Sequence, residues 1–231
     1  MNNRNTEMIE LISSGLGNEL IEKVIFVGGS VVGFYSTNKL DLDIRYTEDV
    51  DCVVNISIRN EFNNFEQELR KRNFKNDIRE NAPICRWNYL HLTVDIMPVD
   101  FKIFGFTNEW YRIGLENVID FKINEKLSIQ IFSAPYFLAT KIQANNNRGG
   151  TDIRFSHDFE DIVFILNNRI ELLEEIINLK NKKLKKYLKT EFNKLLSLSY
   201  IDEAIECVIP YGLGNKTINK IKDIMKNISE I

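Results

Sequence analysis

The β-type segments of this chain are confined to its first 132 residues, and this asymmetry constrains the fold more than any other feature. Short runs of apolar and β-branched residues predict strands at residues 23–29, 50–57, 89–97, 118–123 and 127–132. Apolar residues at helical spacing predict helices at residues 6–20 and 59–74. Later, only helical spacing recurs, at residues 135–147, 156–166, 168–178, 180–197, 199–208 and 216–229. We therefore predict an α/β (α+β) fold, with a mixed sheet and flanking helices in residues 1–133 and a helical bundle in residues 134–231.

The composition limits the classes of function. The net charge of −3 over 231 residues gives no overall attraction to nucleic acid, so such binding requires a local basic surface. Three widely spaced cysteines and two histidines argue against a zinc site, and an odd cysteine count fits a reducing compartment. No apolar stretch reaches the length of a membrane span, and the N-terminus is not a signal peptide. We therefore expect a cytoplasmic protein without membrane contact.

One apolar run ends in "VGGS", which contains Gly28, Gly29 and Ser30. A strand that ends in glycines just before a helix start leaves backbone N–H groups that can bind an anion such as phosphate. Many turns of α/β proteins have this composition, so the motif alone is weak evidence for a nucleotide site.

Two Asp-x-Asp pairs follow this turn, and their surroundings distinguish them. Residues i and i+2 of a strand point to the same face, so either pair could hold a divalent cation. Asp41 and Asp43 are followed at once by polar residues, which favours acids in a solvated turn. Asp49 and Asp51 enter the apolar run "CVVNISI", which would anchor one face and hold both carboxylates on the other. We predict that Asp49 and Asp51 bind a metal ion.

A third carboxylate is needed if two metal ions are to be bridged in phosphoryl transfer. Asp95 is the strongest candidate, because it lies on the polar face of an alternating strand, where an unpaired acid is costly to bury. Asp100, beyond Pro98, is the weaker choice. His91 falls on the same face as Asp95, and a hydrogen-bonded structural histidine explains it more simply than a metal ligand.

The helical half supplies further candidates. Lys141 lies mid-helix among apolar residues, which fits either a side chain that reaches solvent or one that binds an anion. Arg148 precedes two glycines that stop a helix, and it could clamp phosphate from the loop. Helix capping explains Ser156 and Asp158. It does not explain Asp161, which lies beside apolar residues on a helix that must pack inward.

A basic helix is predicted at residues 180–194, which carry seven lysines against one glutamate, Glu191. Its apolar stripe consists of Leu184, Leu188, Phe192 and Leu195. Such a lysine face is most often simply solvated. The alternative is a binding surface for RNA or for an acidic partner protein.

Several motifs occur in an order that is more specific than any one of them. They are "VGGS", "RYTEDVD", "PICRW", "VDIMP", "GFTNEWY" and "KIQANNNRGGTDIRFSHDFEDI". From about residue 24 to 170 the chain thus resembles the nucleotidyltransferase superfamily that includes DNA polymerase beta. Within it, the chain is similar to the AbiEii/MenT-type nucleotidyltransferases of bacterial toxin–antitoxin and phage-defence systems. One departure is the gap of 18 residues between Ser30 and Asp49, which is longer than most of the superfamily uses.

The resemblance implies a Mg²⁺- or Mn²⁺-dependent enzyme of the EC 2.7.7 type. It would transfer a nucleotide from a nucleoside triphosphate such as ATP to an acceptor hydroxyl, for example the 3′ end of tRNA. The implied catalytic residues are Asp49, Asp51, Asp95, Lys141 and Asp161, with the first three as metal ligands. The implied nucleotide-binding residues are Gly28, Gly29, Ser30, Lys141, Arg148 and Asp158. The helical domain would complete the active site, and a cognate antitoxin is an implied partner.

Two roles stay open for Asp161, which could orient Lys141 or activate the acceptor hydroxyl. Two alternatives to the toxin function also stay open: a catalytically silent module that binds nucleotide or a partner, and a nucleotidyltransferase that modifies a small molecule such as an antibiotic. The intact glycine-serine turn and the three aspartates argue against the silent module. A P-loop kinase is excluded, because no G-x-x-x-x-G-K-[ST] motif occurs.

Overall fold

The computed structural model describes residues 4–38, 44–148 and 152–231, so Asp41 and Asp43 lie outside the described residues. The described part of the chain forms two compact units. The first contains residues 1–31 and 45–133, and the second contains residues 32–44 and 134–231. The second unit thus takes in a short early segment that the sequence pattern does not separate from the first half.

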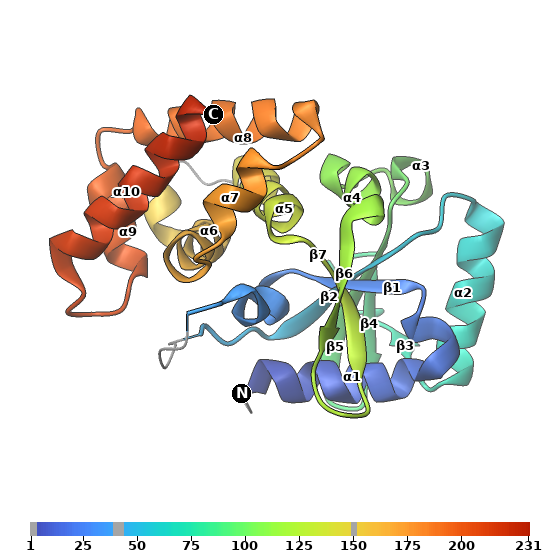
Figure 1. The fold of residues 1–231 in the computed structure, drawn as a ribbon. Helices are drawn as coiled ribbons and strands as arrows, with labels where there is room; N and C mark the ends of the chain where they lie inside the picture. Colours follow the sequence, from blue (N-terminus) through green and yellow to red (C-terminus); the bar gives the residue numbers. More distant parts are fainter. Residues whose placement is uncertain (1–3, 39–43, 149–151) are drawn as a thin grey trace. The chain divides into compact units, whose positions relative to one another are not determined.

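The first unit is built on a mixed sheet (Figure 1). In the described part of the chain, this sheet contains seven strands in the order β3-β4-β5-β2-β1-β7-β6. The strands are β1 Val24–Val27, β2 Asp49–Val54, β3 Lys75–Asn76, β4 Arg86–Tyr89, β5 Leu92–Pro98, β6 Val118–Lys122 and β7 Ser128–Phe132. β2 runs parallel to β5, whereas β1 runs antiparallel to β2 and parallel to β7. Every residue of the interior strand β1 is buried, which explains its uninterrupted apolar sequence.

Amphipathic helices accompany this sheet. They are α1 Arg4–Ile21, α2 Arg59–Lys71, α3 Phe101–Phe104, α4 Glu109–Gly114 and the 3₁₀ turn η2 Leu115–Asn117. α2 buries Phe62, Phe65 and Leu69, which recur at the spacing of one helix face. α1 buries Ile12 and Leu16 completely. Burying one such side chain contributes roughly 1.5–3 kcal/mol, so these faces anchor both helices to the first unit.

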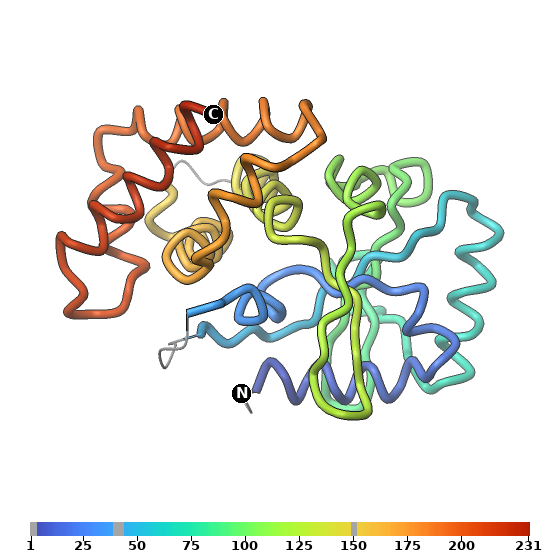
Figure 2. The backbone as a smooth tube through the Cα atoms, in the orientation of Figure 1, coloured from blue at the N-terminus to red at the C-terminus, as the bar shows by residue number. Residues whose placement is uncertain are grey.

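The second unit is helical (Figure 2). Its helices are α5 Ala134–Arg148, α6 His157–Asn168, α7 Leu172–Ile177, α8 Lys182–Leu196, α9 Ile201–Val208 and α10 Gly214–Glu230, with the 3₁₀ turn η3 Ile153–Phe155 before α6. α5 packs against α6, and α8 packs against α10. The predicted stripe of α8 is confirmed, since Leu184, Leu188, Phe192 and Leu195 are all buried. None of the described helices combines the length and the apolar character that crossing a membrane requires.

The strand predicted at residues 89–97 is wrong in its first part, which is a hairpin turn. β4 pairs antiparallel with β5, and Tyr89 lies opposite Leu92. Leu90 has a φ of +53° and is 70 % exposed, so it forms the tight turn with His91. Apolar Leu90 continues the even-numbered series Leu92, Val94 and Ile96 of β5 although it lies in the turn, and the alternation therefore hid the turn. His91 lies in this turn and not on the strand face that carries Asp95.

Other predicted elements differ less. The helix expected from Ser30 is the 3₁₀ helix η1, Gly29–Tyr35. β6 and β7 confirm the strands predicted near residues 118–123 and 127–132. The short elements β3, β4, α3 and α4 were not anticipated, because two to six residues carry too little periodicity to stand out.

Candidate functional site

Three carboxylates lie on one face of the central sheet. The parallel register of β2 and β5 places Asp51 opposite Asp95, and Asp49 lies two residues before Asp51 on the same strand. Residues that pair across neighbouring strands, or lie two apart along one strand, share a face. Asp95 is buried, and both other aspartates are half-buried. The fold thus brings together three acids that are separated by up to 46 positions in the sequence.

Gly28 lies directly beside the carboxylate of Asp51. It follows β1, whose last residue, Val27, pairs with Asp51 in the antiparallel register. Gly28 has a φ of +74°, and a Cβ atom added there would fall 2.0 Å from Oδ2 of Asp51. Any side chain at this position would collide with the acid, and the left-handed backbone also favours glycine. The first glycine of the turn is therefore required by its closeness to Asp51.

The remaining residues of the turn begin η1. Ser30 is buried, and its hydroxyl donates a long hydrogen bond of 3.5 Å to the carbonyl oxygen of Val27. This bond ties the start of η1 back to the end of β1. Gly29 is the first residue of η1, where backbone N–H groups lack partners within the helix. Anion binding by this turn stays a prediction.

Arg86 is a functional candidate that the sequence interpretation missed. It belongs to β4, and the antiparallel register places it opposite Asp95 on β5. Its guanidinium donates two hydrogen bonds to Asp95, Nε to Oδ1 and Nη2 to Oδ2, each 2.8 Å long. Nη2 also donates to Oδ2 of Asp49 at 3.1 Å. The hydrogen bonds that Arg86 donates to Asp95 raise the pKa of Arg86 above its ordinary value. The only signal in the sequence was its place in the motif "PICRW".

Two thiols near the aspartates are held protonated. Burial raises the pKa of Cys85 to about 12, and the negative charge of Asp95 adds to the shift. Burial likewise raises the pKa of Cys52, with the charges of Asp51 and Asp95 as lesser causes. The thiolate is the nucleophilic form of cysteine, so neither residue is suited to nucleophilic chemistry at neutral pH.

Asp49, Asp51 and Asp95 supply the hard oxygen donors that Mg²⁺ prefers, so the donor chemistry fits a divalent cation. Nevertheless, within residues 4–38, 44–148 and 152–231 no three histidine, cysteine or acidic side chains are grouped so as to hold a metal ion. Arg86 provides a physical reason, because it engages both oxygens of Asp95 and one of Asp49. The cluster has the chemistry of a metal site, with a guanidinium bound to two of its three acids.

The second unit contains a buried ionic cluster of its own. Lys141 of α5 lies 2.7 Å from Oδ2 of Asp161 and 3.1 Å from Oδ1 of Asp158, both on α6. All three side chains are buried. The interpretation that Lys141 reaches solvent is therefore wrong. A buried lysine with two carboxylates satisfies the rule that buried charges must be paired.

The ends of α5 and α6 surround this cluster. The hydroxyl of Ser156 accepts a hydrogen bond from the N–H of Phe159, so the predicted cap is confirmed. The same hydroxyl donates to Oδ1 of Asn145 at 2.6 Å, which fastens the start of α6 to α5. Arg148, at the end of α5, lies 4.0 Å from Asp158 and its side chain is 74 % exposed. The structure thus brings Lys141, Arg148, Asp158 and Asp161 together within the second unit.

The lysines of α8 face away from its buried stripe. Lys182, Lys183, Lys186, Lys189 and Lys194 are exposed. Glu191, the one acid of the predicted run, is buried and accepts hydrogen bonds from Asn146 and Lys194. The exposed face of α8 is therefore strongly basic, although the net charge of the whole chain is −3.

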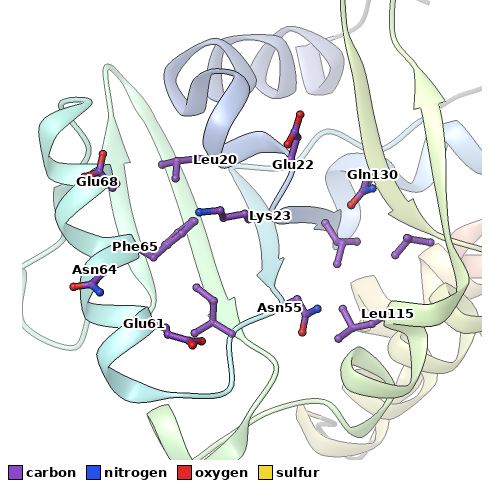
Figure 3. Close-up of a pocket in the computed structure, with 13 residues that line it drawn as sticks. Leu20, Glu22, Lys23, Asn55, Glu61, Asn64, Phe65, Glu68, Leu115 and Gln130 are labelled. Atoms are coloured by element: carbon purple, nitrogen blue, oxygen red, sulfur yellow. The ribbon is translucent and has the colours of Figure 1, made fainter.

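A cavity of about 560 Å³ lies elsewhere in the first unit (Figure 3). Lys23, just before β1, and Asn55, just after β2, contribute to its wall, together with Phe65 of α2. Gly28 and Asp49 lie at the other ends of the same two strands. None of the described residues that line this cavity is a predicted site residue. The largely apolar cavity is thus separate from the aspartate cluster.

Comparisons with known proteins agree with the observed fold. The sequence model of a family described as "Nucleotidyl transferase AbiEii toxin, Type IV TA system" matches residues 18–206. No curated protein matches the chain significantly. A crystal structure described as "putative nucleotidyltransferase from H. pylori" is similar in fold, with a TM-score of 0.50 and 13 % sequence identity. That similarity covers 98 % of this chain and 93 % of the other. The fold predicted from the sequence is thereby confirmed.

Proposed function

Because the chain belongs to the AbiEii nucleotidyl transferase toxin family of type IV toxin–antitoxin systems, we propose that this nucleotidyltransferase modifies RNA with the help of Mg²⁺ or Mn²⁺. Nucleotidyl transfer follows from membership of the family, which also implies a nucleotide substrate and an antitoxin partner. The metal, the RNA acceptor and the individual roles of the residues are the proposed part.

One observation carries the proposal: Asp49, Asp51 and Asp95 share a face of adjacent strands, with Gly28 in contact range of Asp51. A cation bound by these acids would neutralise charge on the phosphate oxygens of the nucleotide. Phosphoryl transfer depends mainly on positioning and on charge stabilisation, so acids on rigid strands are suited to it. No covalent nucleophile is needed, in keeping with the protonated thiols of Cys52 and Cys85.

We assign the chemical steps to the residues of this cluster. The oxygen of the acceptor hydroxyl attacks the α-phosphorus of the nucleotide, and Asp95 accepts the proton of that hydroxyl. A bond forms between the acceptor oxygen and the α-phosphorus. At the same time the bond between the α-phosphorus and the α,β-bridging oxygen breaks, and pyrophosphate leaves with that oxygen. The backbone N–H groups of Gly29 and Ser30 hold phosphate oxygens, as at other helix starts. Within the second unit, Lys141 and Arg148 are proposed as phosphate ligands, with Asp158 and Asp161 orienting the lysine.

The basic face of α8 supports RNA as the acceptor. Its exposed lysines, among them Lys182, Lys186 and Lys189, have no exposed acid beside them on the helix. Lysine contacts with phosphates release counterions and supply affinity without base specificity. A cytoplasmic location agrees with this proposal, because the enzyme would meet both its RNA substrate and its antitoxin there. Free thiols at Cys52, Cys85 and Cys207 agree with a reducing compartment.

The central experiment compares the wild type with Asp49→Asn/Asp51→Asn and a matched control, Asp120→Asn/Asp223→Asn. Both control acids are exposed and lie outside the cluster, so the two double variants change the net charge equally. Each protein is incubated with each α-labelled triphosphate, Mg²⁺ and total cellular RNA. We expect labelled RNA from the wild type and the control, and none from the cluster variant. Labelling by the cluster variant at the wild-type rate would refute the assignment.

A second variant tests binding of the RNA acceptor separately from nucleotide transfer. Lys182→Gln/Lys186→Gln/Lys189→Gln should lower RNA labelling and flatten its dependence on salt concentration, because fewer phosphate contacts are made. The control, Lys75→Gln/Lys122→Gln/Lys126→Gln, removes exposed lysines from the first unit and should behave like the wild type. If a protein or a small molecule is labelled in cell extract while RNA is not, the RNA part of the proposal fails and the transfer chemistry stands.

A further inference from the structure

Arg86 lies beside the aspartate cluster and donates hydrogen bonds to two of its three acids. Its register position opposite Asp95 directs the guanidinium to the face that carries the acids. The two parallel bonds to Asp95 form the bidentate arrangement that gives arginine–carboxylate pairs both strength and a fixed geometry. The third bond joins the same guanidinium to Asp49. One positive group thus links two strands through their acids.

The same bonds occupy the oxygens that a divalent cation would need. Both oxygens of Asp95 and one oxygen of Asp49 accept hydrogen bonds from Arg86. A cation and a guanidinium cannot share these oxygens at full strength, because each requires the same lone pairs and the two positive charges repel one another. Binding one must therefore weaken the other.

The side chain of Arg86 has room to leave. It is 24 % exposed, whereas the side chain of Asp95 is 10 % exposed. The aliphatic part of an arginine side chain is long and flexible. Moving its guanidinium group into water costs less free energy than leaving the buried acid without a partner. Exchange is therefore favourable only when another positive charge takes over the acids.

We propose that Arg86 is the resident counter-cation of the Asp49–Asp51–Asp95 cluster, and that a divalent cation displaces its guanidinium from Asp95 and Asp49. The inference rests on the proposed function, because it concerns the same acids. Without a metal, Arg86 relieves the repulsion among the carboxylates and holds them in place. With a metal, Asp95 and Asp49 exchange the guanidinium for the cation. Arg86 is thus a positioning residue that makes formation of the competent site depend on the cation.

The first test measures Mn²⁺ binding without nucleotide, by the loss of the free-ion signal in electron paramagnetic resonance. Arg86→Gln removes the competing charge, so Mn²⁺ should bind about tenfold more tightly, a gain of about 1.4 kcal/mol. The control is Arg79→Gln. The side chain of Arg79 pairs with Asp77 and is 71 % exposed. Its substitution by glutamine changes the net charge by the same amount as Arg86→Gln. The control should bind Mn²⁺ like the wild type. Equal or weaker binding by a folded Arg86→Gln variant overturns the proposal.

The second test needs no variant that might fail to fold. In the wild-type protein labelled with ¹⁵N-arginine, the Nε–H signal of Arg86 is observed by nuclear magnetic resonance and assigned with Arg86→Lys. We expect this signal to be protected from water exchange without metal, because Nε donates to Asp95. Saturation with Mg²⁺ should shift it and increase its exchange. A signal that keeps its position and protection under saturation overturns the proposal.

The outcomes separate this inference from the proposed function. If wild-type protein binds Mn²⁺, Asp49→Asn/Asp51→Asn does not, and Arg86 stays on Asp95, only the exchange is refuted. If neither the wild type nor Arg86→Gln binds Mn²⁺, the metal dependence and the exchange both fail. If the metal displaces Arg86 but no nucleotide is transferred, the exchange stands and the proposed reaction fails.

Discussion

Gly28 and Asp51 are so close that a Cβ atom at position 28 would lie 2.0 Å from the Oδ2 atom of Asp51. The contact joins the end of β1 to the start of β2, and it makes the glycine of the turn and the acid of the strand one structural feature. A substitution at the glycine therefore acts on the acid.

Gly28→Ala should abolish nucleotide transfer and lower the free energy of unfolding by roughly 1–3 kcal/mol. The methyl group must push aside either the Asp51 side chain or the backbone of the turn. Gly105→Ala is the control, because Gly105 also has a positive φ, +79°, but a Cβ atom added there would meet nothing within 4 Å. The control should show only the backbone cost, about 1–2 kcal/mol, and keep its activity. Urea unfolding and the labelled-nucleotide assay measure both effects. Full activity in Gly28→Ala would show that Asp51 can move without consequence.

Lys141→Met should destabilise the second unit by about 3–5 kcal/mol, because it removes the buried positive charge that pairs with both Asp158 and Asp161. The control, Lys222→Met, breaks an exposed pair with Asp202 and should cost about 0–1 kcal/mol. Adding Asp161→Asn to Lys141→Met should recover part of the loss, since it removes one uncompensated charge. Thermal unfolding of the four proteins measures these differences. A double variant that is no more stable than Lys141→Met would contradict the coupling of the pair.

A thiol reagent at pH 8 should label Cys207 rapidly in the native protein, and Cys52 and Cys85 only after unfolding. Cys207 is exposed, whereas the other two are buried. The pKa of Cys85, raised to about 12 by burial, keeps it in the unreactive thiol form at this pH. The absorbance of the released reagent counts the labelled thiols. Native Cys207→Ser should react negligibly, and rapid labelling of that variant would show that the core beside the aspartates opens.

Asp100 should contribute to the dependence of stability on pH. The backbone N–H of Lys102, and then the charge of Arg112, hold the pKa of Asp100 below its ordinary value. The folded state therefore favours the ionised form. The stabilisation is present above the unfolded pKa, which is about 3.9, and is lost as the pH falls through the lower folded pKa.

Asp100→Asn keeps a side chain that can cap α3 but removes the charge. The wild type should be more stable than this variant at pH 7, and the difference should shrink toward pH 3. Urea midpoints at pH 7, 5 and 3 measure the trend, with the exposed Asp120→Asn as a control for net charge. A difference that grows as the pH falls would reverse the expected sign.

The periodicity of apolar residues along each segment was sufficient to predict whether most elements are helices or strands. It also predicted part of the candidate site. The two-residue period of a strand places Asp49 and Asp51 on one face, whatever the partner strands are. The apolar stripe of α8 likewise predicts which of its residues are buried, because a helix repeats its faces regularly. The hairpin turn escaped detection, since Leu90 continues the apolar alternation of β5 although it lies in the turn.

Only the tertiary structure decided which side chains meet. Asp95 faces Asp51 because β5 pairs parallel to β2 in one particular register, and a shift by one residue would turn it to the other face. Arg86 reaches two acids through strand pairing, and Lys141 is buried through the packing of α5 on α6. The periodicity of one segment determines its own faces, but contacts between segments depend on long-range pairing that no local pattern encodes.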